Sequence, residues 1–414
     1  MEVKENIHVA KTTAFSRIII DFIFPVERNK DFSLYGNLLV RMLTKKTKKY
    51  PNEEVWDSAL TEHYVMNFSL SKGQCGKNWF YTYHVVLPDK GILKEEDYDY
   101  QKTLQFVMES IYDPFALEDS FYEKEIEIAK NKLKMYIESV YKNIKSYASI
   151  RTDELLDDCG YFSDSILNNQ EQLESISKEN LYKYYMENIQ NTSPHVFVVG
   201  NVKEDFLHAL ECNLPNKKLS SFFPYQVMPF PINPKTKVEE ECKEYNQSII
   251  KFAYKVENYQ YEDMVLLSLI SFLLNSQSSG ILMEYLRMQE KLVYTASASV
   301  LTDYGVFYIT AQIYRDKKDK AIETIKEIMH KLEDKDFLTE KLERVKMRKR
   351  VNLERQKDVI STYMSDLLDT YFGTAPTFLE EYEMIKNITV EDIISFVKKM
   401  HLDTIYYLEG SKDE

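Results

Sequence analysis

The chain of 414 residues contains few glycines, few histidines and few cysteines. Its ten glycines form no glycine-rich loop of the kind that cradles a phosphate. Its seven histidines include no pair spaced i, i+4, and no Ser-His-Asp or Cys-His arrangement rises above chance. The cysteines include no C-x-x-C pair, so we expect reduced thiols rather than a disulfide framework or a zinc knuckle. They are Cys75, Cys159, Cys212 and Cys242.

The chain also lacks a long hydrophobic run and a positive net charge. The longest apolar run, from Met264 to Leu274, is about half the length that would span a bilayer. The first ten residues are polar and charged, unlike a secretory signal peptide. The net charge of -13 argues against nucleic acid, because duplex binding needs a cationic surface. We therefore expect a cytoplasmic protein with neither a membrane nor a nucleic-acid partner.

Enough apolar and aromatic residues are present to fill large cores. Hydrophobic residues make up 44% of the chain, and its length implies two or more domains. Alternating and continuous apolar patterns predict strands at 14–26, 65–70, 79–87, 195–200, 248–256, 294–300 and 306–313. Helical periodicity covers 33–44, 52–62, 101–143, 263–274, 316–332 and 336–368.

The two halves of the chain repeat the same order of elements. The segment I-S-K-E-N-L from Ile176 resembles I-T-V-E-D-I from Ile388, which lies 212 positions later, and each precedes an amphipathic helix and a strand. Thr389 and Asp392 fit a helix capping box. An internal duplication is the simplest account of the repeat. Runs of strands followed by runs of helices in each half indicate an α+β fold.

A stretch with five prolines and little charge separates the two halves. We interpret residues 214–238 as an interdomain linker. The sequence therefore predicts an N-terminal domain at 1–213 and a C-terminal domain at 239–414. We expect the two domains to be homologous, each a mainly antiparallel sheet with helices packed on one face.

The stretch from Leu274 to Ala298 combines a polar loop, an amphipathic helix and an alternating strand. Arg287 lies near the end of this helix and Tyr294 at the start of the strand, so both side chains can point toward the same space. A guanidinium beside a phenol hydroxyl suits a peptide carbonyl or a developing oxyanion. From spacing alone, the more common outcome is an arginine on a solvated face and a tyrosine in the core.

The pattern L-x-x-x-x-S-x-x-L-x-x-x-L-R-x-x-x-x-L-x-Y in this stretch resembles the second half of the insulinase-like (pitrilysin) inverted zincins. In that family an arginine and a tyrosine seven residues apart hold the substrate, which implies a substrate-binding role for Arg287 and Tyr294. The family has a glycine-rich loop before the helix. Asn275 and Ser276 stand at those positions here.

The family's zinc site is degenerate in this chain. The first helix of the family carries H-x-x-E-H, and the segment G-N-L-L-V-R-M-L-T-K-K-T-K-K-Y-P resembles the text around it. In that register Asn37 and Arg41 occupy the two histidine positions and Val40 the position of the catalytic glutamate. Lys132 replaces the last metal ligand on a later helix. Because cations repel zinc, the resemblance implies no metal in this chain at this degenerate site (Asn37, Val40, Arg41 and Lys132).

One alternative arrangement of ligands stays open from the sequence. Glu62 and His63 end a segment that would read H-x-x-E-H if its first residue, Ala59, were histidine. A glutamate next to a histidine on a helix is more often a surface pair than a metal remnant. His84, on a predicted strand, is expected in the core or at a sheet edge. If the register above is wrong, Glu62, His63 and His84 become the candidate ligands.

Within the family the whole chain resembles a bacterial subgroup of zinc-less subunits that accompany an H-x-x-E-H subunit of similar size. One such pair is associated with the 5-aminopentanol modification of elongation factor P. The resemblance implies a non-catalytic, substrate-gripping subunit of a heterodimeric zinc metallopeptidase that processes peptides, with zinc supplied by the partner chain. Two alternatives remain, a structural scaffold subunit and a peptide-binding module without a role in catalysis.

Overall fold

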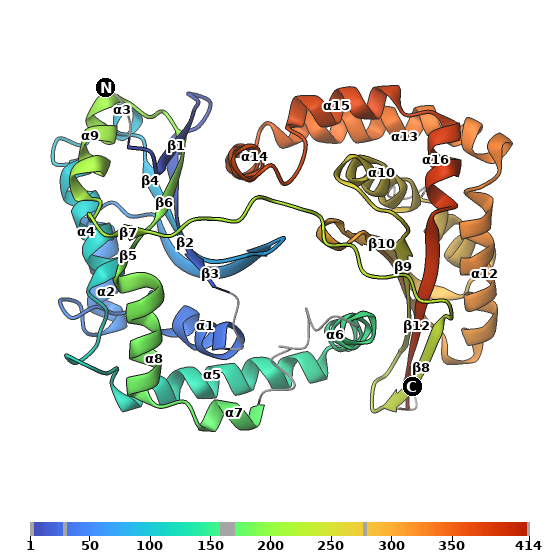
Figure 1. Ribbon diagram of the computed structural model, residues 1–414, viewed down its shortest axis with the longest axis horizontal. Helices are drawn as coiled ribbons and strands as arrows, with labels where there is room; N and C mark the ends of the chain where they lie inside the picture. Colours follow the sequence, from blue (N-terminus) through green and yellow to red (C-terminus); the bar gives the residue numbers. More distant parts are fainter. Residues whose placement is uncertain (1–3, 28–30, 158–169, 276–279, 412–414) are drawn as a thin grey trace. The chain divides into compact units, whose positions relative to one another are not determined.

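The computed structural model describes residues 4–27, 31–157, 170–275 and 280–411 (Figure 1). The chain divides into two units that each contain one five-stranded sheet. Unit 1 comprises Met1–Ile137, Ile166–Tyr225 and Lys357–Thr374, and unit 2 comprises Glu138–Ser165, Gln226–Gln356 and Ala375–Glu414. Ser276 and Cys159, which the sequence singled out, lie outside the described residues.

The sheet of unit 1 has the strand order β1-β6-β2-β4-β3. Its strands are β1 (Ile7–Lys11), β2 (Arg17–Val26), β3 (Asn67–Cys75), β4 (Asn78–Pro88) and β6 (His195–Gly200). β1 pairs with β6 in parallel, and the other pairs are antiparallel. The central strand β2 is buried on both faces from Ile18 to Phe24, which explains its nearly continuous apolar sequence.

The sheet of unit 2 repeats this topology. Its order is β8-β12-β9-β11-β10, again with one parallel pair, β8–β12, and three antiparallel pairs. These strands are β8 (Lys237–Lys243), β9 (Ser248–Val256), β10 (Val293–Leu301), β11 (Val306–Ile313) and β12 (Met400–Gly410). Two helices of each unit also correspond at the spacing of 212 residues, α5 (Glu123–Lys142) with α13 (Lys335–Gln356) and α8 (Lys178–Tyr185) with α16 (Val390–Val397). The predicted α+β fold with two homologous sheets is confirmed.

The remaining elements complete each unit around its sheet. Unit 1 contains α1 (Asp31–Met42), α2 (Glu53–Glu62), α3 (Lys90–Leu93), α4 (Tyr100–Tyr112), α7 (Gln170–Glu174), the π-helical turn η1 (Met186–Gln190), α9 (Glu204–Asn213) and the short parallel pair β5 (Thr192–Ser193) and β7 (Lys218–Leu219). Unit 2 contains α10 (Met264–Asn275), α11 (Ile281–Met283), the π-helical turn η4 (Glu284–Gln289), α12 (Lys318–Lys331) and α15 (Phe378–Asn387).

Each half of the sequence gives one helix to the other unit. α6 (Ile144–Leu156) comes from the first half but packs on the sheet of unit 2, where Tyr147 and Ala148 join a core cluster with Ile249 and Leu408. α14 (Ile360–Phe372) comes from the second half but packs on the sheet of unit 1. The chain between these helices passes from unit 1 to unit 2 after Tyr225, inside the predicted linker.

Two predicted helices are each divided in the structure. The helix expected at 101–143 is two helices, because α4 ends at Tyr112 and α5 begins at Glu123. The exchange of helices explains the other division. The charged helix expected at 336–368 is two helices, because α13 ends at Gln356 and α14 begins at Ile360. Ile360 and Met364 are buried against Ile19 and Phe197 of the unit 1 sheet. α14 buries its apolar face on the sheet of unit 1, whereas α13 packs against α10, α15 and α16 of unit 2, so the two helices are separate elements.

Local sequence signals set the ends of two elements. Thr389 and Asp392 form the predicted capping box at the start of α16, with Thr389 N donating to Asp392 Oδ2 at 2.8 Å. Gly305 ends the turn before β11 at φ +61, and a Cβ there would lie 2.6 Å from the Tyr259 ring. Among the described residues, no helix is both long and apolar enough to cross a membrane.

Candidate functional site

The structure brings Arg287 and Tyr294 together at the edge of the unit 2 sheet. β10 is an edge strand, and its register with β11 shifts between Val293 and Thr295, so Tyr294 is the extra residue of a β-bulge. Arg287, on η4, donates from Nη1 to the carbonyl oxygen of Tyr294 at 2.8 Å. The guanidinium therefore holds the backbone of the bulge, and the bulge sets the direction of the tyrosine side chain.

The sequence did not predict a third residue of this surface, Tyr314. Its ring lies 4.2 Å from the Tyr294 ring, centroid to centroid, at an interplanar angle of 43°. Tyr314 directly follows β11, and its backbone N–H bonds the carbonyl of Leu292 at 3.3 Å, which fixes it beside the start of β10. Tyr314 is 39% exposed. The only sequence signal for this surface is an aromatic residue just beyond the strand that pairs with β10.

The Arg287 side chain keeps most of its hydrogen-bonding capacity. A guanidinium has five N–H groups, and in the described structure Arg287 places one of them on a protein acceptor. The side chain is exposed, so a carbonyl or carboxylate oxygen of a bound molecule can reach the others. Chemically, the pair can hold a peptide carbonyl with charge-assisted hydrogen bonds.

The degenerate site lies on α1 and α5 of unit 1. Arg41 donates from Nη1 to the Asn37 carbonyl at 2.8 Å and to Asn37 Oδ1 at 3.2 Å. Its guanidinium carbon lies 5.3 Å from the centre of the Tyr136 ring on α5. Burial lowers the pKa of Arg41 below its usual value, yet an arginine stays protonated at neutral pH. Val40 is half-buried, and Lys132 is exposed one helical turn before Tyr136.

The three alternative metal ligands, Glu62, His63 and His84, each contact groups other than a shared metal site. The His63 ring stacks on Phe106 with centroids 4.3 Å apart, and Glu62 accepts a hydrogen bond from Ser58 on the same helix. His84 Nδ1 lies 2.6 Å from Asp21 Oδ1, and this hydrogen bond raises the pKa of His84 despite the opposing effect of burial. In the described ranges, no three His, Cys, Asp or Glu side chains gather in a group that could hold a metal ion.

The two α+β units, each with one five-stranded sheet, match the fold expected from the resemblance to the insulinase-like peptidases. Residues 175–349 match the family model described as "Peptidase M16 inactive domain". The resemblance predicted from the sequence is thereby confirmed, and the chain is similar to inactive M16 metallopeptidases.

Individual relatives cover nearly the whole chain. It is 22% identical over 433 aligned positions to the "Probable inactive metalloprotease YmfF" of Bacillus subtilis, covering 98% of this chain and 96% of the relative. A conserved protein from Enterococcus faecalis V583 has the same fold, with a TM-score of 0.86, 19% identity, and coverage of 99% and 97% of the two chains. The periplasmic protease PqqL of Escherichia coli matches with a TM-score of 0.70 and 14% identity over 98% of this chain but 47% of PqqL.

Proposed function

We propose that this chain is the non-catalytic, substrate-gripping subunit of a two-chain zinc metallopeptidase that processes peptides. The observation that carries the proposal is the exposed Arg287 side chain, bonded to Tyr294 on a sheet edge, in a homologue of inactive M16 peptidases. The partner would be a homologous H-x-x-E-H subunit of similar size. That subunit would contain the zinc and the general base.

The PqqL comparison supports a paired arrangement. This chain corresponds to about half of the PqqL chain, which leaves room in PqqL for a second fold of similar size. A heterodimer would bring two such folds together as separate chains. Cations at two positions of the degenerate site, Arg41 and Lys132, favour metal binding by the partner rather than by this chain.

Arg287 and Tyr294 would act on the peptide near the bond that is cut. We expect the substrate to add as a strand to a sheet edge of the partner, since main-chain pairing accepts many sequences. The guanidinium and the phenol hydroxyl would donate to a substrate carbonyl and stabilise the negative charge that develops on it. Zinc in the partner would supply the activated water and polarise the scissile carbonyl.

A structural scaffold remains the second candidate function. The hydrogen bond from Arg287 to the Tyr294 carbonyl favours it, because an arginine that only stabilises the β-bulge needs no contact with a substrate. A peptide-binding module without a role in catalysis is a further alternative, and binding of unstructured peptides by the isolated chain would favour it.

Point variants in the two-chain enzyme separate the first two functions. The chain is co-purified with its H-x-x-E-H homologue, and hydrolysis of a quenched fluorescent peptide library is measured. Arg287→Ala and Tyr294→Phe should each lower kcat by about 10²–10³, the usual loss for one oxyanion donor, while the complex still assembles. Arg344→Ala, an exposed arginine on α13, is the matched control and should change nothing. Unchanged kcat in both variants would leave the scaffold as the better account.

A further inference from the structure

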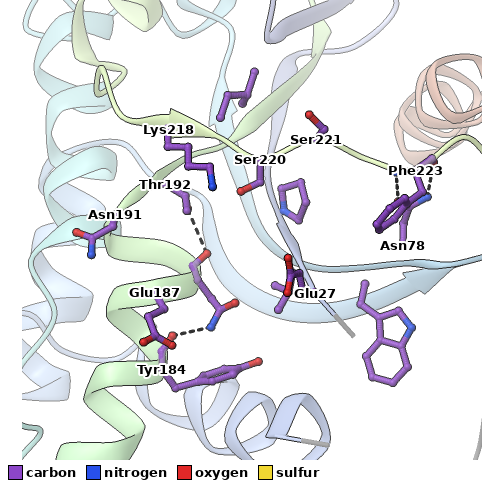
Figure 2. A pocket seen from close by; sticks show the side chains of 15 residues that line it. Glu27, Asn78, Tyr184, Glu187, Asn191, Thr192, Lys218, Ser220, Ser221 and Phe223 are labelled. Atoms are coloured by element: carbon purple, nitrogen blue, oxygen red, sulfur yellow. Dashed lines mark hydrogen bonds between the residues drawn. The ribbon is translucent and has the colours of Figure 1, made fainter. Parts of the chain in front are cut away.

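Unit 1 contains a cavity of about 730 Å³ whose lining residues include none of the four residues of the degenerate site (Figure 2). It lies between the end of β2, the start of β4, the end of α8 with η1, and β7 with the extended segment that follows it. A cavity of this size falls within the range of small-ligand sites, which is roughly 300–1,000 Å³.

The cavity begins where the central strand of the sheet loses one neighbour. The pairing of β2 with β6 ends at Ile23, whereas its pairing with β4 continues to Val26. The stretch from Phe24 to Val26 therefore has no strand on its β6 side. Pro25 lies in this stretch, and proline is tolerated in a sheet where a strand lacks a neighbour, because it has no N–H to donate. The side of β2 that faces the cavity therefore offers a bound molecule one backbone acceptor, the Pro25 carbonyl.

The opposite side of the cavity is a fixed, extended segment, residues 220–223. Asn78 holds the backbone of Phe223 from both sides, with its Nδ2 donating to the Phe223 carbonyl at 2.9 Å and its Oδ1 accepting from the Phe223 N–H at 2.7 Å. The Ser220 carbonyl accepts a hydrogen bond from His195 Nε2 at 2.8 Å. Ser221, between these two anchors, makes no hydrogen bond to the residues that the structure describes and lines the cavity.

Two aromatic side chains give the cavity stable walls. The Tyr184 ring stacks on Tyr35 at 5.1 Å between centroids, and its hydroxyl accepts from Tyr81 at 3.2 Å. Trp79 packs edge-on against Phe32 at 4.7 Å. Aromatic rings attract cations to their faces and pack against aliphatic chains. These walls therefore suit a ligand that carries a methylene chain with a positive end.

The charged residues of the cavity are two carboxylates and one ammonium. Figure 2 shows Glu27 and Glu187 on different sides of the pocket, with Lys218 entering from β7. Glu27 has no ion-pair partner in the described part of the chain, and Glu187 forms a long ion pair, 3.9 Å, with the exposed Lys183. The balance of charge favours a cationic ligand.

We propose that this slot binds a short, extended peptide segment and places one of its lysine or arginine side chains between Glu27 and Glu187. The backbone of the segment would donate to the Pro25 carbonyl and lie along residues 220–223. This inference rests on the proposed function, because a site that selects peptides with basic residues matters only in a chain that binds peptide substrates. Binding itself needs this chain alone.

The test measures binding to the isolated full chain. The probes are dansylated, C-amidated pentapeptides that differ only at a central lysine, glutamine or glutamate, with spermidine as a separate competitor. The lysine peptide should bind at least about tenfold more tightly than the glutamine peptide, and the glutamate peptide should bind worst. Glu27→Gln and Glu187→Gln should each weaken binding of the lysine peptide about fivefold, as expected for the loss of one partly exposed ion pair. The exposed Glu118→Gln is the matched control.

The Lys218→Gln variant tests whether the slot prefers a positively charged side chain. Removal of this lysine should tighten binding of the lysine peptide, because a charge of the same sign is lost from the slot. Weaker binding in Lys218→Gln, or equal binding of the lysine and glutamine peptides, would overturn the proposal. Tight binding of spermidine without peptide binding would also overturn it, in favour of a free polyamine. The proposed function is tested separately, because the Arg287 and Tyr294 variants are read out in peptide cleavage by the two-chain enzyme.

Discussion

Lys255 on β9 and Asp403 on β12 form a buried ion pair whose disruption should strongly destabilise unit 2. Lys255 Nζ lies 3.0 Å from Asp403 Oδ2, and the two residues are 1% and 2% exposed. Asn233 Nδ2 donates to the same carboxylate oxygen at 2.7 Å, and the Thr404 hydroxyl donates to Oδ1 at 2.7 Å. Lys255→Met leaves the carboxylate buried with two neutral donors and no counter-charge. We expect a loss of about 3–5 kcal/mol in the free energy of unfolding.

The assay is chemical denaturation followed by circular dichroism, with hydrogen exchange at β9 and β12 to report on unit 2. Lys335→Met, which removes an exposed ion pair with Glu391, is the matched control and should leave the midpoint unchanged. The double variant Lys255→Met/Asp403→Leu removes both charges and should cost less than the two single variants together. If Lys255→Met cost no more than the control, the charges would not be desolvated as the structure shows them.

Three further predictions concern pH, helix capping and the lost metal site. The bond with Asp21 raises the pKa of His84, so its stabilisation is present below pH 6.5 and is lost as pH rises through the folded pKa. The unfolding midpoint of the native protein should fall from about pH 6 to 8 by an amount that His84→Gln lacks, and an identical fall in both would refute this. Thr389→Ala should cost about 0.5–2 kcal/mol in urea unfolding while Thr389→Ser costs little, and equal losses would show that the capping box is unimportant. The quadruple variant Asn37→His/Val40→Glu/Arg41→His/Lys132→Glu restores the family's residues and should bind zinc detectable by metal analysis. Absence of bound zinc would mean that α1 and α5 do not have the spacing of a zinc site.

The central strands and the repeat could be predicted because their signals are local. β2 and β9 are buried on both faces, so their sequences are mainly apolar, with buried charges only at Asp21 in β2 and at Lys251 and Lys255 in β9. The spacing of 212 residues found between two short segments also relates α5 to α13. One long periodic pattern failed where the chain passes between units, since α13 belongs to unit 2 and α14 packs on the sheet of unit 1. The other failed at the break between α4 and α5.

Elements held by polar contacts could not be predicted from apolar patterns. α6 docks on its sheet through Arg151, whose Nε donates to Glu241 at 2.9 Å, and through Asp153, which accepts from the Tyr308 hydroxyl at 2.8 Å. β8 has the sequence K-V-E-E-E-C-K and pairs in parallel at a sheet edge, so its strand is set by backbone bonding rather than by burial.

The candidate site was predicted in part. The family resemblance selected Arg287 and Tyr294, and the structure places the guanidinium of one on the backbone of the other. The bulge at Tyr294 was invisible in the sequence, because it depends on the register with β11. Tyr314 was missed for the same reason, since its closeness to Tyr294 follows from strand pairing and not from spacing along the chain.

Metal analysis tests the central claim most directly. The isolated chain and the two-chain complex are each incubated with excess zinc, passed through gel filtration and assayed for zinc and protein. The account predicts a zinc-to-protein ratio near zero for this chain alone and about one zinc for each complex. A ratio near one for the isolated chain would contradict the account and would make Glu62, His63 and His84 the residues to mutate.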